Sequence, residues 1–168
     1  MEPNDLSYSE RQRFRQWWLW TLVLIGPAIS LGTIFQDIVL SSSFDTNPTN
    51  YSFLIILGVA FPLFMYTTGL DTQVGKLGVF VCFRPFHRKW LVFRFDDIHK
   101  AESHIYRPLK DYGGWGIRSG RGSKAYNVSG DKGVLLTMKD GKTIMIGSKN
   151  HEVLCSAIKE QLPRTLER

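Results

Sequence analysis

The chain has 168 residues and a formal net charge of +6, with 21 Lys and Arg against 15 Asp and Glu. This length allows one small folded domain beside a pair of apolar segments. Cys82 and Cys155 lie 73 residues apart, and the four histidines show no metal-ligand spacing. We therefore expect no metal centre, no cofactor and no disulfide framework, and we expect both thiols to be buried.

The positive charge is concentrated in residues 71–168, which hold 18 Lys and Arg against 10 Asp and Glu, a balance of +8. Residues 1–70 have a balance of −2. A basic domain attracts anionic surfaces, and anionic lipid headgroups are the partner that this charge first indicates. The sequence contains no recognised nucleic-acid-binding motif, so we expect no nucleic-acid partner.

Two apolar segments dominate the first half of the chain and predict a transmembrane hairpin with helices at about 17–40 and 52–70. The first has 24 residues, and the second has 19 and no charge. About 20 apolar residues cross a bilayer core as a helix. The lipid bilayer is therefore an expected partner, and the alternative is a pair of buried core helices in a soluble protein.

Basic residues on both sides of the hairpin set its expected orientation. Residues 1–16 are polar and form an N-terminal segment that we expect to be cytoplasmic. Lys and Arg are retained on the cytoplasmic side, which places both chain ends there and predicts a two-pass protein of the cell membrane. The residues expected at the membrane interface are Arg11, Arg13, Arg15, Trp17 and Trp18.

Residues 71–168 change to short β-rich runs separated by turn residues. They predict a cytoplasmic β domain that ends in a helix at about 150–162, where apolar residues recur at helical spacing and form one face: Val153, Leu154, Ala157, Ile158 and Leu162. Asp140-Gly141 predicts a type I′ hairpin turn. The predicted fold is a partly open antiparallel β-barrel with a C-terminal capping helix, in an α+β membrane protein; a small sandwich is the alternative. The predicted strands are 70–74, 78–83, 90–95, 98–106, 115–118, 124–128, 133–139 and 142–146.

Several motifs of this chain resemble a bacterial and archaeal family of uncharacterised two-helix membrane proteins. The most specific is Tyr112-Gly-Gly-Trp-Gly-Ile-Arg118; others are Arg84-Pro-Phe-His87, Tyr106-Arg-Pro-Leu109, 124–130 and 141–147. Phe95 stands where that family often has Trp before an Asp-Asp-Ile element. The resemblance implies a domain similar to the bacterial pleckstrin-homology (PH) fold, with seven strands and a capping helix.

Candidate anion-binding residues lie in three turns and strands of the basic half, and one more, Arg107, lies in the 106–109 motif. Cations beside aromatic residues at 84–90 suit an anionic headgroup, whereas an ordinary polar hairpin is the simpler reading. The glycine-rich run 112–118 is either a ligand-lining strand or a tightly packed strand with Trp115 in the core. The basic loop 120–124 is either a phosphate contact or a plain turn. The candidates are Arg84, His87, Arg88, Lys89, Arg107, Trp115, Arg118 and Arg121.

No catalytic constellation is recognisable. Asp96 and Asp97 are adjacent in a predicted strand, so their side chains point to opposite faces and cannot act as an acid–base pair. We therefore predict a membrane-anchored interaction module, not an enzyme, whose PH-like domain engages anionic lipid headgroups or a protein partner. The alternative is an assembly subunit that acts through self-association or by packing against another membrane protein.

Overall fold

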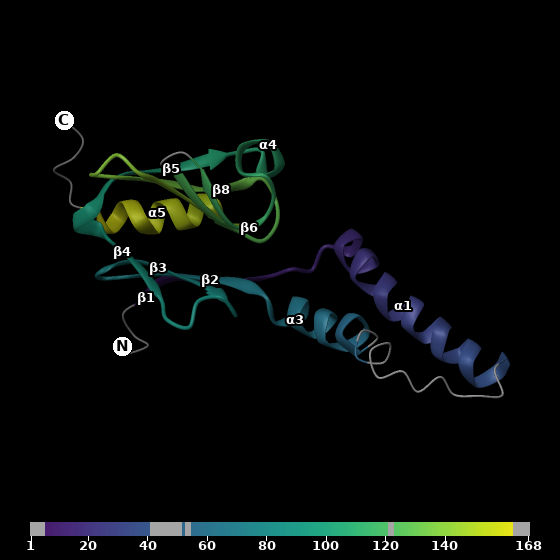
Figure 1. The fold of residues 1–168 in the computed structure, drawn as a ribbon. Helices are drawn as coiled ribbons and strands as arrows, with labels where there is room; N and C mark the ends of the chain where they lie inside the picture. The colour runs from purple at the N-terminus through teal and green to yellow at the C-terminus, as the bar shows by residue number, and fades with distance from the viewer. Residues whose placement is uncertain (1–5, 41–51, 53–54, 121–122, 163–168) are drawn as a thin grey trace. The chain divides into compact units, whose positions relative to one another are not determined.

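The computed structural model describes residues 6–40, 52, 55–120 and 123–162. The chain divides into two compact units, one formed by residues 1–13 with 69–168 and the other by residues 14–68. Figure 1 shows the helices α1 and α3 in the second unit and the strands with α5 in the first.

The helical unit consists of α1 (Trp17–Leu40), a π-helical turn η2 (Ile56–Ala60) and α3 (Phe61–Thr67). Two glycines sit where α1 and η2 meet. A Cβ at Gly26 would lie 3.3 Å from the backbone oxygen of Leu57, and one at Gly58 would lie 3.5 Å from Ser30 Oγ. Small residues thus allow these two elements to approach closely within the unit.

No helix in the described part of the chain is both long enough and apolar enough to cross a membrane. This finding contradicts the predicted transmembrane hairpin and the predicted two-pass location in the cell membrane. The predicted helix 52–70 ends early, because α3 stops at Thr67 while Gly69 and Leu70 belong to a strand.

The first sheet contains a strand that the sequence analysis missed. Leu6–Arg13 forms β1 and pairs with β2, although residues 1–16 were expected to be a polar segment beside a membrane. The order is β1-β2-β3-β4, and every pair is antiparallel. The other three strands are β2 (Gly69–Gly75), β3 (Gly78–Arg84) and β4 (Leu91–Arg94).

The second sheet has the order β5-β8-β9-β7-β6, in which β7 and β9 run parallel. The described strands thus form two separate open sheets, one of them mixed, which contradicts the predicted antiparallel barrel. All eight predicted strands have counterparts, β2 to β9, with bounds within two residues. The strands of this sheet are β5 (Ile98–Ile105), β6 (Gly116–Gly120), β7 (Ser123–Asn127), β8 (Lys132–Met138) and β9 (Thr143–Gly147).

The C-terminal helix α5 (His151–Gln161) packs on β1, β2 and β3 of the first sheet and on β5 and β8 of the second. Figure 1 shows it between the two sheets. Its buried face includes Leu154 and Ile158, whereas Val153, which was expected on that face, is exposed. The main core is therefore apolar side chains of both sheets closed around one helix face, and it includes Leu70, Val74, Val79, Val81, Phe83, Ile98, Val134, Leu136, Ile144 and Ile146.

Two local predictions are wrong in informative ways. The β8–β9 turn is not type I′, because among its residues only Gly141 has a positive φ, +84°. Gly141 N–H donates to the Met138 oxygen and Met138 N–H donates to the Lys142 oxygen, which is a three-residue loop with a type I turn and a left-handed glycine. Residues 95–97 form a short 3-10 helix, η3 (Phe95–Asp97), so the two aspartates are not in a strand.

Candidate functional site: an arginine cluster on Asp71

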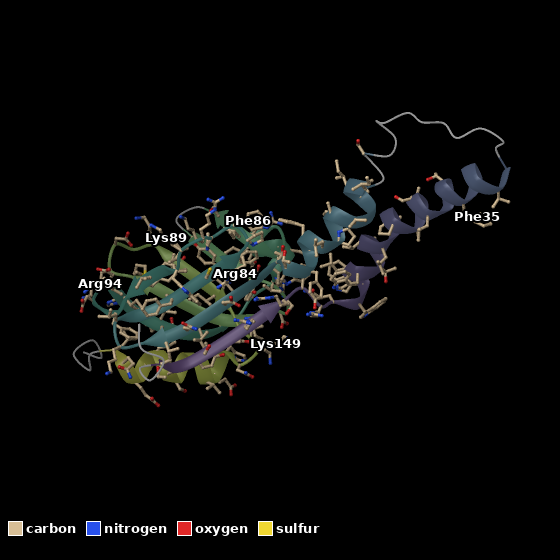
Figure 2. All side chains as sticks on the ribbon, turned by 90° about the horizontal axis from the view of Figure 1, so that it is seen from below. Phe35, Arg84, Phe86, Lys89, Arg94 and Lys149 are labelled. Carbon is tan, nitrogen blue, oxygen red and sulfur yellow. The ribbon has the colours of Figure 1, made fainter. Side chains whose placement is uncertain are left out.

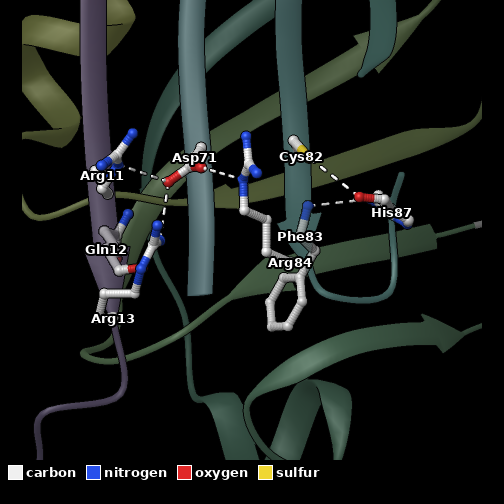
Figure 3. A network of polar contacts seen from close by, with 8 residues as sticks. All are labelled: Arg11, Gln12, Arg13, Asp71, Cys82, Phe83, Arg84 and His87. Atoms are coloured by element: carbon white, nitrogen blue, oxygen red, sulfur yellow. Dashed lines mark hydrogen bonds and ion pairs between the residues drawn. The ribbon is translucent and has the colours of Figure 1, made fainter. Parts of the chain in front are cut away.

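Three arginines converge on one carboxylate in the first sheet. Asp71 of β2 has only 6% of its side chain exposed. Its Oδ1 lies 2.9 Å from Arg13 Nη1 and 3.4 Å from Arg11 Nε, and its Oδ2 lies 2.9 Å from Arg84 Nε (Figure 3). We call these four residues the Asp71 cluster.

The strand register explains why the cluster forms. Arg11 is directly opposite Asp71, and Gly69 is opposite both Arg13 on one side and Arg84 on the other. Directly opposed residues, and residues two apart along a strand, share one face of a sheet. Residues from three neighbouring strands therefore meet on the same face.

Gly69 supplies the space that Arg13 needs. A Cβ at this position would overlap Arg13 Nη1 and the backbone oxygen of Gln12. Because Gly69 has no side chain, Arg13 can lie across β2 and reach Asp71. A glycine in a strand here marks a close approach rather than a weak point in the pairing.

The cluster carries an uncompensated positive charge, since three guanidiniums face one carboxylate. Arg13 is mostly buried, with 19% of its side chain exposed, and also donates to the Gln12 oxygen at 2.9 Å. Arg11 and Arg84 are exposed, at 72% and 53%. Arg13 and Asp71 therefore form the base of the cluster, and Arg11 and Arg84 present charge to solvent.

The other face of β1 is fixed by polar contacts with the segment that leads into α5. Gln12 Nε2 donates to the Gly147 oxygen at 2.7 Å. The Glu10 carboxylate accepts from Ser148 Oγ at 2.6 Å and from Lys149 N–H at 3.0 Å. It also accepts from Tyr8 Oη, and burial raises the pKa of Tyr8 to about 12. These bonds hold the strand that carries Arg11 and Arg13.

The loop between β3 and β4 lies beside the cluster and is organised by His87. Phe83 N–H donates to His87 Nδ1 at 3.1 Å, and the ring packs edge-on against Tyr126, with centroids 5.8 Å apart. Burial, with a smaller effect of the Lys124 charge, lowers the pKa of His87. A neutral ring that accepts a backbone bond is a structural support, so His87 is a poor anion contact.

The exposed residues of this loop include the two remaining cations predicted there. Arg88 and Lys89 are exposed, as is the apolar ring of Phe86, and Figure 2 shows Phe86 and Lys89 at the margin of the β unit. Under the loop, Cys82 Sγ donates to the His87 oxygen at 3.4 Å, and burial raises the pKa of this thiol. Both cysteines are free and buried, as expected.

The other candidate anion contacts belong to the second sheet. Arg107 N–H donates to Asp111 Oδ2 at 2.7 Å, just before the short helix α4 (Pro108–Tyr112). Trp115 Nε1 donates to the Gly130 oxygen at 3.0 Å, and Arg118 Nε donates to the Trp115 oxygen at 3.1 Å. These bonds fix Arg107 and Arg118 to their own segments and tie Trp115 to the turn before β8. Arg121 lies outside the described residues.

The residues predicted for a membrane interface fall into both units. Arg11 and Arg13 belong to β1 and to the Asp71 cluster. In the helical unit, the Arg15 guanidinium lies 4.8 Å from the centroid of the Tyr66 ring, and Trp17 and Trp18 are exposed. The structure thus assigns Arg11 and Arg13 a role in the sheet that the interface prediction did not contain.

The residues that sequence reasoning missed are Asp71 and Gly69. One signal was present: Arg11, Arg13 and Arg15 recur every second residue, which is the spacing of one face of a strand. Asp71 directly follows the apolar run 52–70 and lies in the predicted strand 70–74. Only the pairing of β1 with β2 reveals that the two features belong together.

The geometry defines an α+β domain of two open sheets around a helix, with an arginine cluster on one sheet face. No protein-family model matches the chain, and a search of curated proteins finds no match. The resemblance to the two-helix family therefore stays a prediction. In the described part of the chain, no group of three or more His, Cys, Asp or Glu residues is placed to hold a metal ion.

Proposed function

We propose that the chain is an interaction module that binds an anionic partner through the Asp71 cluster and performs no chemistry of its own. The observation that carries this proposal is the convergence of three arginines on one buried carboxylate, with Arg11 and Arg84 exposed. Asp71 neutralises one of the three charges, which leaves an excess of +2 in one place.

The wider charge of the chain supports the same function. Residues 71–168 carry a balance of +8, and a surface of one sign accelerates the encounter with an oppositely charged partner. The cluster adds specificity to this general attraction, because guanidiniums fixed by a carboxylate offer their donors in defined directions. General charge alone would give binding that no single arginine controls.

A titration of the full-length chain with a fluorescent poly-glutamate peptide tests the proposal by anisotropy at low and at high salt. The double variant Arg11→Gln/Arg84→Gln is expected to lose at least tenfold in affinity, whereas Arg94→Gln should bind like the parent. Arg94 is a suitable control because it is an exposed arginine that is paired with Asp96. It belongs to β4 and lies opposite Gly78, whereas Arg84 is at the other end of β3 (Figure 2). Equal losses in the two variants would refute a role for the cluster.

A second candidate function, self-association, is favoured by the helical unit. Large apolar side chains on α1 and α3 are exposed, and this many exposed apolar side chains in one helical unit are unusual on a protein without a partner. These side chains carry no charge, so the same face of a second copy can cover them without repulsion. They include Leu22, Leu24, Ile25, Ile29, Leu31, Phe35, Leu63 and Phe64.

Sedimentation of the purified full-length chain with and without detergent tests this second candidate. A dimer or higher species is expected, and Ile25→Gln/Ile29→Gln should shift it to monomer. Leu77→Gln is a matched control, because Leu77 is an equally exposed apolar residue outside the helical unit. A monomer that binds detergent and shows no concentration dependence would contradict self-association.

A further inference from the structure

We infer that the Asp71 cluster binds a phosphomonoester group, which Arg11 and Arg84 contact from two sides. This inference rests on the proposed function and names the class of anion that the cluster fits. Phosphomonoester groups occur in small metabolites and in lipid headgroups, and the chemistry of the phosphate group is the same in both.

The two exposed arginines contact Asp71 in a geometry that suits a further anion. Arg11 and Arg84 both contact the carboxylate through Nε, at 3.4 Å and 2.9 Å, so their Nη groups are not used in these ion pairs. Figure 3 shows the two guanidiniums on either side of Asp71. The terminal N–H donors of both side chains therefore extend beyond Asp71, which suits an incoming anion.

The guanidiniums of Arg11 and Arg84 lie close to each other. Both Nε atoms contact oxygens of a single carboxylate, so the two guanidiniums are held close to each other despite their like charge. A tetrahedral phosphate has three charged oxygens that point in different directions, and one group can accept from two guanidiniums at once. A carboxylate has only two oxygens, which lie in one plane, so it offers the two guanidiniums fewer directions of approach than a phosphate does.

The charge of a phosphomonoester matches the charge of the cluster. The cluster has an excess of +2, and a phosphomonoester carries a charge of about −1.5 to −2 near neutral pH. Its binding would leave the cluster close to neutral. A monoanion would leave part of the repulsion between Arg11 and Arg84 in place.

Asp71 has a positioning role in this arrangement, and its replacement distinguishes a built site from a patch of charge. Asp71→Asn raises the local charge to +3, so attraction alone predicts tighter phosphate binding in the variant. If Asp71 orients the arginines, the variant has to order two long side chains on binding and binds more weakly. The direction of the change therefore decides between the two explanations.

Isothermal titration calorimetry of the full-length chain provides the test, with inorganic phosphate, a soluble inositol phosphate and a phosphoserine peptide as separate probes. Arg11→Gln and Arg84→Gln are each expected to weaken inositol phosphate binding about tenfold or more. Arg84→Lys keeps the charge but loses the fork of donors, and it should weaken binding several-fold. Arg94→Gln should leave binding unchanged. If the inositol phosphate binds more tightly than inorganic phosphate, the ligand of the cluster is a phosphate ester. Equal affinities identify the ligand as free phosphate.

Other results overturn the inference, and they do so in distinguishable ways. If poly-glutamate binds through Arg11 and Arg84 but no phosphate probe competes with it, the phosphate inference is wrong and the proposed function stands. If neither poly-glutamate nor phosphate binds, both are wrong. Binding of the phosphoserine peptide alone would replace a small phosphomonoester with a phosphorylated protein. An Arg84→Lys variant that binds like the parent would refute the two-sided contact.

Discussion

Replacement of Asp71 by Asn tests the structural role of the cluster most directly. The variant keeps the size of the side chain but leaves the guanidiniums of Arg11, Arg13 and Arg84 without their shared carboxylate. The bond to the mostly buried Arg13 is worth about 1.5–3 kcal/mol, as for other hydrogen bonds between charged groups. The exposed pairs with Arg11 and Arg84 add about 0.2–1 kcal/mol each. We expect a total loss of about 2–5 kcal/mol.

Hydrogen exchange followed peptide by peptide is the suitable assay, because the chain has two units and a single unfolding curve would mix them. A loss of about 2–5 kcal/mol corresponds to a fall in protection of about 30- to 5,000-fold for the amides of β1 and β2 that exchange by this opening. Arg13→Ala should follow Asp71→Asn most closely, and Arg11→Ala should have the smallest effect. The reasoning is refuted if Arg11→Ala costs as much as Asp71→Asn, or if protection in β1 is unchanged in the Asp71 variant.

Three further predictions concern the surroundings of the cluster. Gly69→Ala should displace Arg13 and cost about 1–3 kcal/mol by overpacking, which exchange in β1 would report while β8 stays protected. His87→Asn should flatten the pH dependence of the stability of the β unit. The lowered pKa of His87 gives the parent stability that is complete above pH 6.5 and is lost as pH falls toward the folded-state pKa, and hydrogen exchange of the β3 amides between pH 7.5 and 4.5 measures it. Tyr106→Phe should cost about 1–3 kcal/mol, seen as lower protection of the β7 amides against exchange, because buried Asn127 Nδ2 loses its 3.0 Å acceptor.

The strands of the basic half could be predicted from the sequence because their signals are local. In β8 and β9, buried Val134 and Leu136 lie opposite Ile146 and Ile144, and the alternation of side chains is visible within each strand. The helix α5 was equally accessible from its apolar spacing. The exposure of Val153 could not be predicted, because it depends on which parts of the helix surface the two sheets cover.

The arrangement of these strands could not be predicted, because pairing partners leave no trace within one strand. The parallel pairing of β7 with β9 joins Ala125 to Met145, across the chain segment that forms β8. The same limitation hid β1, whose sequence is polar and whose buried Gln12 contacts Gly147, far along the chain. The length of the apolar run 52–70 suggested one helix, whereas pairing with β1 and β3 draws its last two residues into β2.

The candidate site depends on the docking of β1, and this links ligand binding to local stability. Arg11 and Arg13 reach Asp71 only while β1 is paired with β2, and on its other face β1 is held by the bonds of Glu10 to Ser148 and Lys149. An anion that binds Arg11 and Arg84 together therefore binds the docked state alone. Such a ligand must stabilise docking by RT ln(1 + [L]/Kd), about 2.7 kcal/mol at a hundredfold excess over Kd. Protection of the β1 amides should thus rise with ligand concentration, whereas an anion attracted only by the general charge of the chain would leave β1 no more protected than β8.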